Sequence, residues 1–183
     1  MTRLVFVTSN EGKAREAEQL LGTQVEAVSL ELPELQTLSF EEVVRGKAVE
    51  AARLTGRRVL VEDSGLELRV WKGYPGPFTK WITNHIDDAA LARMLDPFED
   101  RSAEAVAVVG IAEPGQRPDE VLVAEGRIRG SIAAAPRGSS GFGWDVLFIP
   151  EGESRTWAEM TVEEKLRDSH RSRAFAALAK LLG

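Results

Sequence analysis

Cysteine is absent from this 183-residue sequence, and histidine occurs only twice. Disulfide bonds and thiolate metal sites are therefore excluded, and so is a metal site built on several histidines. The side chains that remain for binding a metal are carboxylates, which favour hard ions such as Mg²⁺.

Positive charge is also scarce, because 23 lysines and arginines face 29 aspartates and glutamates, for a net charge of −6. A sequence-independent nucleic-acid binder needs a broad basic face, so no nucleic-acid polymer is expected as a partner. No apolar run is long enough to cross a membrane, and the short run after Arg3 does not make a signal peptide. We expect a cytoplasmic protein with no membrane partner.

Hydrophobic residues make up 43% of the chain, which is enough to bury a core, and we expect residues 1–183 to form a single domain. Apolar runs predict strands at 4–7, 25–30 and 59–61. Ser9 or Asn10 is predicted to cap the first helix, which Gly22 ends. Ser39 is predicted to open a second helix through a capping box, and Gly56 to end it.

The second half of the chain has a different pattern. Alternation suggests extended chain at 66–70, helices are predicted at 78–85 and 87–95, and residues 102–112 and 120–130 are predicted antiparallel neighbours. A strand is expected at 146–149, and Ser169 is predicted to cap the last helix. The sequence therefore predicts an α/β fold in which a long, mixed, twisted sheet is flanked by helices.

The first motif is FVTSNEGK, at residues 6–13, where a buried strand runs into a polar turn and a helix. Backbone N–H groups at a helix start lack partners and carry partial positive charge, so they bind phosphate well. Thr8, Ser9 and Asn10 add neutral donors, and Lys13 adds a full charge. The alternative is an ordinary capped helix with a solvated lysine, and the residue order of a P-loop is lacking.

The second motif, VEDSGLEL at residues 61–68, places Glu62 and Asp63 directly after a predicted strand and before a Ser-Gly turn. A carboxylate on such a rigid support can hold a metal or take a proton from water. Glu34, in LPELQ, is a further candidate ligand. The alternative is a solvated turn, since Asp and Gly favour turns.

The third motif is GSSGFGWD, at residues 138–145. Its glycines let the backbone approach a ligand closely. Phe142 and Trp144 offer flat faces for stacking a base, and Asp145 offers an acceptor for ring N–H groups. A β-turn with core aromatics is the alternative, but Phe-Gly-Trp in a glycine-rich loop is unusual for a core.

The fourth motif is EEKLRDSHR, at residues 163–171. It gathers Lys165, His170 and Arg171 beside the predicted helix cap at Ser169. Cations at a helix start oppose the helix dipole, so the pattern predicts an anion or another partner that offsets this cost. The alternative is a solvated basic patch.

Together these motifs resemble the inosine triphosphate pyrophosphatase family, the Ham1-like non-canonical purine nucleoside triphosphate pyrophosphatases. The resemblance covers nearly the whole chain in order, through FVTSNEGK, LPELQ, VEDSGL, KGYPGPFTKW, FEDRSA, SSGFGWDVLF, TWAEMTVEEK and SHR. It implies a sheet in two lobes with a nucleotide cleft between them, usually in a homodimer. The implied reaction hydrolyses ITP, dITP or XTP to the monophosphate and pyrophosphate, which cleans the nucleotide pool.

The resemblance also implies roles for single residues. Glu34 and Asp63 correspond to the carboxylates that hold Mg²⁺, Asp63 corresponds to the catalytic base, and Glu62 is expected to assist either one. The substrate contacts implied by the resemblance and the motifs are Thr8, Ser9, Asn10, Lys13, Lys47, Ser64, Lys80, Phe142, Gly143, Trp144, Asp145, Lys165, His170 and Arg171.

Two other functions are consistent with a nucleotide site. One is a broad-specificity nucleotide phosphatase that releases orthophosphate, and the other is a nucleotide sensor without turnover. The pair of Glu34 and Asp63 argues against the sensor, because binding alone does not need a base. For the homodimer, the segment KGYPGPFTKWITNHI at residues 72–86 is a candidate contact surface, since it is rich in aromatics and too irregular to be all core. The alternative is that its aromatics pack beneath the loop within one subunit.

Overall fold

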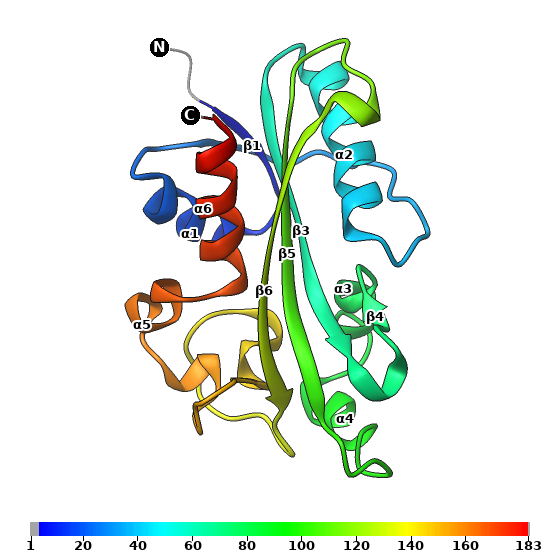
Figure 1. Cartoon of the computed structure of the whole chain (residues 1–183), viewed down its shortest axis with the longest axis vertical. Helices are drawn as coiled ribbons and strands as arrows, with labels where there is room; N and C mark the ends of the chain where they lie inside the picture. Colours follow the sequence, from blue (N-terminus) through cyan, green and yellow to red (C-terminus); the bar gives the residue numbers. More distant parts are fainter. Residues whose placement is uncertain (1–3, 183) are drawn as a thin grey trace.

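A seven-stranded mixed sheet forms the centre of the computed structural model, which describes residues 4–182 (Figure 1). The strand order is β2-β1-β3-β5-β6-β7, and β4 (Pro75–Gly76) pairs with β3 outside this path. β1 (Val5–Val7) runs parallel to β2 (Glu26–Val28) and to β3 (Val59–Leu68). The remaining pairs are antiparallel and add β5 (Ser102–Ala112), β6 (Leu122–Ile132) and β7 (Phe148–Pro150). The predicted α/β fold with a mixed sheet is confirmed.

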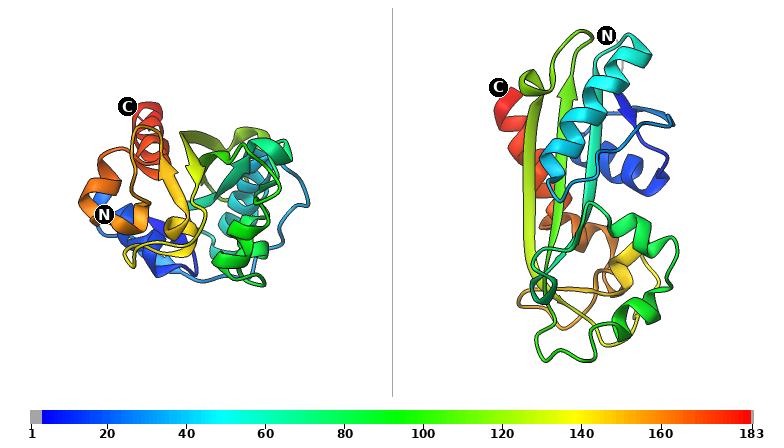
Figure 2. Two further views of the ribbon diagram at one scale, coloured as in Figure 1. Left: turned by 90° about the horizontal axis from the view of Figure 1, so that it is seen from below. Right: turned by 90° about the vertical axis from the view of Figure 1, so that its right-hand side faces the viewer.

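Helices cover both faces of this sheet. α1 (Glu11–Leu21) and α6 (His170–Leu182) lie on one side of the long strands, and α2 (Phe40–Thr55) lies on the other (Figures 1 and 2). Because side chains alternate along a strand, Val59 and Val61 of β3 pack with α2, whereas Leu60 packs with α1 and α6. The hydrophobic runs of β3 and β5 therefore form two cores, one on each face.

A third apolar cluster lies at the other end of the long strands. It contains Leu66 and Leu68 of β3, Phe148 of β7 and Trp157. Shorter helices surround this half of the molecule, namely α3 (Thr79–Thr83), α4 (Asp88–Arg93) and α5 (Val162–Arg167). Because β3, β5 and β6 run through both halves of the molecule, one continuous sheet connects the two halves.

The predicted helix signals at the start of the chain are largely confirmed. Asn10 rather than Ser9 caps α1, and Gly22 and Gly56 end α1 and α2 in the left-handed conformation. Ser39 caps α2 by accepting a bond from Glu42 N–H, but its own N–H donates to the Thr37 hydroxyl. The reciprocal half of the predicted capping box is therefore replaced by a local turn.

The predicted strand end at Val61 is wrong. β3 continues through Glu62 and Asp63 to Leu68 and pairs with β5 over its whole length. The other edge of β3 is interrupted. Pairing with β1 stops at Val61, opposite Val7, and pairing with β4 starts at Leu66, opposite Gly76. Within the described chain, residues 62–65 thus have a neighbouring strand on one side only, and this break in the sheet is where a site can open.

No helix among residues 4–182 has the length and apolar character needed to span a membrane.

Candidate active site

A cleft of about 1060 Å³ opens at the break beside β3. Its walls come from the turn before α1, the coil between β2 and α2, β3, α3, the loop before β7 and the start of α6. All the residues predicted as site residues line this cleft except Lys165, which lies behind Asp145. The structure therefore brings together residues that are more than 160 positions apart in the sequence.

Asp63 points to the α2 side of the sheet, where it contacts a lysine that also contacts Glu34. Lys47 Nζ, from α2, lies 3.3 Å from Asp63 Oδ1 and 3.0 Å from Glu34 Oε1. Lys80 Nζ, from α3, lies 2.5 Å from the same Glu34 oxygen. Burial raises the pKa of the Asp63 carboxyl, an effect that Lys47 only partly offsets. Burial alone would raise the pKa of Glu34, but the hydrogen bond from Lys80 and the charge of Lys47 outweigh this effect, so the pKa of Glu34 is lowered.

The second oxygen of Asp63, Oδ2, is buried and has no hydrogen-bond partner in the described chain. Buried carboxylate oxygens are normally satisfied, so this oxygen has unused capacity to accept a hydrogen bond or to bind a cation. Residues 4–182 contain no cluster of three or more acidic or histidine side chains that could enclose a metal. Two carboxylates suffice for Mg²⁺, which usually keeps several waters and completes its shell with substrate phosphates. Glu34 and Asp63 therefore fit this ion.

The turn before α1 forms the next wall of the cleft. Asn10 Oδ1 accepts a bond from Lys13 N–H at 3.1 Å, and the Thr8 hydroxyl accepts one from Asn10 N–H at 3.1 Å. Ser9 is exposed at the tip of this turn. Lys13 Nζ lies 3.4 Å from Glu62, and burial lowers the pKa of this lysine. A helix start with neutral donors and a cation suits an anionic group.

Glu62 points to the opposite face from Asp63 and joins a buried ion-pair network. Arg171 donates to both of its oxygens, at 2.9 and 2.8 Å, and also to Glu16. Lys165 Nζ donates to Glu16 at 3.0 Å and to Asp145 at 2.6 Å. Burial alone would raise the pKa of Glu62, but Arg171 and Lys13 outweigh it and hold that pKa far below its ordinary value.

This network decides between the two alternatives predicted for the last motif, an external anion or another partner. Ser169 does cap α6, because its hydroxyl accepts a bond from Ser172 N–H. The cost of Lys165 and Arg171 near that cap is offset by buried acids of the chain itself, not by an external anion. A bound anion is thus not needed to explain these two cations.

Glu16 is a site-supporting residue that the motifs did not reveal. It is only 5% exposed, and it joins Lys165 of α5 to Arg171 of α6. A weak signal was present, because Glu16 precedes the buried Ala17 and lies three residues after Lys13, on the same helix face. A charged residue on an inward face needs a buried partner.

Aromatic rings line the end of the cleft that belongs to the second half of the molecule. Trp144 is half-buried against Trp157, with ring centroids 5.7 Å apart, and His170 stacks on Trp157 at 4.9 Å. Both ring nitrogens of His170 are buried without a partner in the described chain, and burial lowers its pKa well below the usual range. A neutral imidazole with free hydrogen-bonding capacity therefore lies beside the indole of Trp144 in the cleft.

Phe142 does not stand free for stacking on both faces. Its ring packs so closely on α1 that a Cβ on Gly12 would lie 2.4 Å from it, and Lys165 Nζ lies 4.8 Å from the ring centroid. Asp145 Oδ2 accepts a bond from Phe142 N–H and closes the turn that contains Gly143. This loop therefore joins the aromatic end of the cleft to the helix start at the other end.

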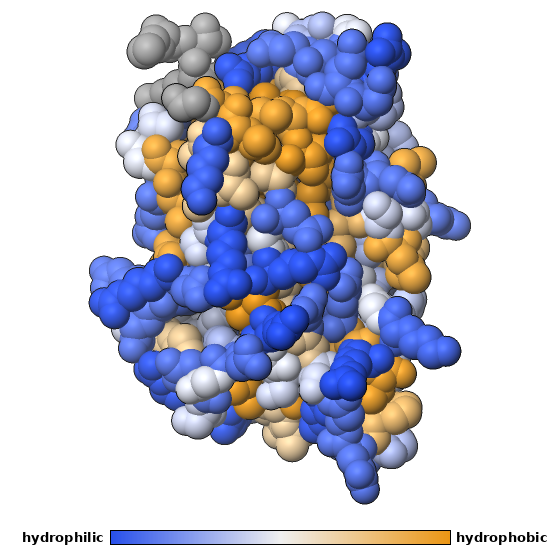
Figure 3. Space-filling model, viewed as in Figure 1, coloured by the Kyte–Doolittle hydropathy of each residue, from blue (hydrophilic) through white to orange (hydrophobic). Residues whose placement is uncertain are grey.

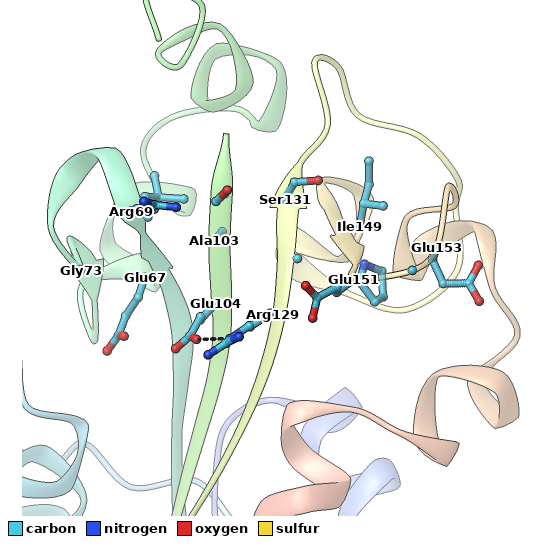
Figure 4. A pocket seen from close by; sticks show the side chains of 15 residues that line it. Glu67, Arg69, Gly73, Ala103, Glu104, Arg129, Ser131, Ile149, Glu151 and Glu153 are labelled. Atoms are coloured by element: carbon cyan, nitrogen blue, oxygen red, sulfur yellow. Dashed lines mark ion pairs between the residues drawn. The ribbon is translucent and has the colours of Figure 1, made fainter. Parts of the chain in front are cut away.

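A second cavity, of about 730 Å³, lies farther along β3, β5 and β6 and shares no lining residue with the cleft (Figure 4). Three of its four acidic side chains are paired within the chain: Glu104 with Arg129, Glu67 with Arg127, and Glu153 with Arg155. None of the predicted site residues lies here, so the cleft at the break in the sheet is the candidate active site.

Comparisons with known proteins agree with this fold. The model of the Ham1 family matches residues 4–181. The chain is 44% identical over 181 residues to the dITP/XTP pyrophosphatase of Methanopyrus kandleri, covering 97% of this chain and 95% of that protein. It is also 44% identical over 179 residues to inosine triphosphate pyrophosphatase 1 of Trypanosoma cruzi, covering 96% and 90%.

Solved structures show the same likeness. A Ham1 protein from Coxiella burnetii superposes with a TM-score of 0.83 at 31% identity, covering 100% of this chain and 98% of that one. The dITP/XTP pyrophosphatase from Mycobacterium abscessus superposes with a TM-score of 0.72 at 38% identity, covering 97% and 98%. The fold is that of a class of nucleotide pyrophosphatases, and the chain belongs to the Ham1 family.

Proposed function

We propose that this protein is a Mg²⁺-dependent pyrophosphatase that hydrolyses non-canonical purine nucleoside triphosphates, namely ITP, dITP and XTP. The products are the nucleoside monophosphate and pyrophosphate. The names of its relatives support the reaction class. The observation that carries the proposal is Asp63, which lines the cleft with Glu34 and Lys47 and has a buried Oδ2 with no hydrogen-bond partner in the described chain.

In this proposal Asp63 is the general base. It accepts a proton from a water molecule whose oxygen forms a bond to the α-phosphorus, while the bond from that phosphorus to the bridging oxygen breaks and pyrophosphate leaves. General-base catalysis of this kind contributes about 10²–10⁴-fold to a rate.

Glu34 and Asp63 hold the Mg²⁺ ion. When bound, this ion supplies positive charge to the phosphate oxygens, where negative charge develops. The chain supplies further charge through Lys13, Lys47 and Lys80, all of which line the cleft. The N–H groups at the start of α1, with Thr8, Ser9, Asn10 and Ser64, provide neutral donors to the triphosphate.

The aromatic end of the cleft holds the purine base of the nucleotide. Trp144 and Phe142 provide apolar faces, and Gly143 allows the turn between them through its positive φ of 58°. The polar wall of this end consists of His170, Asp145 and Arg171. Lys165 supports this wall from behind, because it donates to Asp145 and Glu16. A site that hydrogen-bonds a 6-keto oxygen discriminates against a 6-amino group, because its polar groups would be left unpaired. Glu62 supports this wall by fixing Arg171.

Product analysis tests the function directly. The protein is incubated with ITP and Mg²⁺, and then with GTP and ATP, and the products are separated by ion-exchange chromatography. We expect IMP and pyrophosphate in equal amounts, much slower turnover of GTP and ATP, and no turnover in EDTA. IDP with orthophosphate would identify a phosphatase instead, and nucleotide binding without products would identify a sensor.

We also propose a homodimer of single-domain subunits, as the family resemblance suggests. Supporting it, Tyr74 and Trp81 of the segment 72–86 are 41% and 54% exposed. Apolar surface also gathers beside the upper part of α6 in Figure 3, and α6 ends in Leu181 and Leu182, which are 55% and 49% exposed. Exposed apolar groups in such patches mark contact surfaces.

Light scattering at micromolar concentration tests the dimer. A mass near 20.1 kDa that holds across dilution would show a monomer. Trp81→Ala separates the two patches, since a folded, dimeric variant would place the interface away from residues 72–86. The cytoplasmic location stays a prediction.

A further inference from the structure

Lys47 connects the two carboxylates to which we assign the metal. It lies in the middle of α2, and its side chain is 13% exposed. Glu34 comes from the coil between β2 and α2, whereas Asp63 comes from β3, so no backbone pairing joins these two acids. The Lys47 ammonium group contacts both of them, at 3.0 Å from Glu34 Oε1 and 3.3 Å from Asp63 Oδ1.

Charge explains why this contact matters. Two carboxylates brought together in a partly buried site repel each other, and a cation between them removes that repulsion. Of these two acids, Lys80 contacts Glu34 alone among the described contacts, and its side chain is 48% exposed. Among the contacts of the described chain, Lys47 is therefore the cation that bridges the pair and is shielded from solvent while doing so.

We propose that Lys47 is a positioning residue that holds Glu34 and Asp63 together in the metal-free protein and competes with the divalent ion for these carboxylates. The inference rests on the metal assignment in the proposed function. Binding of the ion displaces the ammonium group from the carboxylates. The side chain, which is anchored on α2, then remains in the cleft with Lys13 and Lys80 on its walls, where it is available to the phosphates.

This competition links metal binding to nucleotide binding. Without a nucleotide, a displaced ammonium group is left unpaired in a partly buried site, which weakens binding of the ion. With a triphosphate in the cleft, the ammonium group gains an anionic partner, and the same displacement costs less. Metal and nucleotide therefore strengthen each other's binding, and the effect has to be reciprocal.

The test measures binding of Mn²⁺ alone, by isothermal titration calorimetry and by electron paramagnetic resonance of the free ion. Lys47→Met removes the competing charge and nearly preserves the shape of the side chain. We expect it to bind Mn²⁺ at least about tenfold more tightly than the wild type, since one nearby positive charge is lost. Lys47→Arg keeps the charge and is expected to bind Mn²⁺ no more tightly than the wild type. Lys180→Met, on the exposed end of α6, is the matched control and should change nothing.

A purely structural role for Lys47 gives a different result. In that case Lys47→Met would melt at a lower temperature while its Mn²⁺ affinity stayed the same or fell, and this outcome would overturn the inference. If the competition exists, Mn²⁺ should raise the melting temperature of Lys47→Met more than that of the wild type. Lys47→Gln serves for the same comparison if Lys47→Met does not fold.

Asp63→Asn distinguishes failure of this inference from failure of the proposed function. If Asp63→Asn abolishes Mn²⁺ binding while Lys47→Met and the wild type bind equally, the metal site is correct and only the competition is wrong. If Asp63→Asn leaves Mn²⁺ binding unchanged, the metal assignment itself is wrong, and the inference falls with it.

Discussion

Glu62 and Asp63 are consecutive residues of β3, and their carboxylates lie on opposite faces of the sheet. Glu62 is bound by Arg171 of α6, whereas Asp63 contacts Lys47 of α2 and has one oxygen without a partner among residues 4–182. The alternation of side chains along a strand thus separates a carboxylate with a charge-pairing role from one that is available for chemistry.

Asp63→Asn should lower kcat for ITP by about 10²-fold or more, because the amide cannot accept the proton of the attacking water. The change preserves the size of the side chain, so the fold should stay intact. Steady-state kinetics with Mg²⁺ and a thermal melt measure both quantities. Asp119→Asn, an exposed residue paired with Arg117, is the control and should behave as the wild type. A near-normal kcat in Asp63→Asn would remove its assignment as the base.

Lys13→Ala should raise KM for ITP by about tenfold or more, with a smaller effect on kcat. The lost interaction is between a charged donor and the triphosphate, a class worth about 1.5–3 kcal/mol. Kinetics over a range of ITP concentrations separate the two parameters, and Lys180→Ala serves as the control. Unchanged kcat and KM would show that Lys13 is an ordinary helix lysine at the edge of the cleft.

Glu62→Gln should reduce the free energy of unfolding at pH 7 by about 3–5 kcal/mol, because it leaves Arg171 buried with one partner fewer. The pKa of Glu62 in the folded state is below its ordinary 4.5, so its ionised form stabilises the fold. That contribution is complete above pH 4.5 and is lost as the pH falls below it toward the folded-state pKa.

Urea unfolding of the wild type and of Glu62→Gln at pH 7 and at about pH 3.5 measures this contribution. The difference between the two proteins should shrink at the lower pH. Other carboxylates titrate in both proteins alike, so they largely cancel from the difference. A gap that stayed constant with pH would mean that the charge of Glu62 does not stabilise the fold.

Gly126→Ala should destabilise the protein by about 1–3 kcal/mol, the usual cost of overpacking. Gly126 lies in β6 under α6, and a Cβ there would be 2.1 Å from His170 O and 2.3 Å from Ala174 N. The helix start that carries His170 and Arg171 would have to move. Gly46→Ala is the matched control, because its nearest neighbour would be 3.5 Å away and alanine favours the helix. Equal stability of the two variants would show that α6 can move away from β6 without cost.

Local sequence signals were sufficient for the helices α1 and α2. Their caps at Asn10 and Ser39 and their glycine ends depend on interactions within a few residues, which is why the pattern predicted them. The polar residues of the four motifs and Glu34 were likewise visible as candidates, and family resemblance extended them to Lys47 and Lys80. α5 was not predicted, although Thr161 and Glu164 form a complete capping box, because the short helix has few apolar positions to give it a period.

Only the tertiary structure decided where β3 ends and how its two acids are used. Asp, Ser and Gly at residues 63–65 favour a turn locally, but pairing with β5 keeps them extended, and Thr79 fits against Gly65 only because that residue lacks a Cβ. The partners of Glu16 were equally hidden, since Lys165 and Arg171 lie about 150 residues away in the sequence. Composition and periodicity thus determined the elements and the chemical types at the site. The tertiary structure determined the roles of the acids, because a carboxylate's function depends on which cation folding brings beside it.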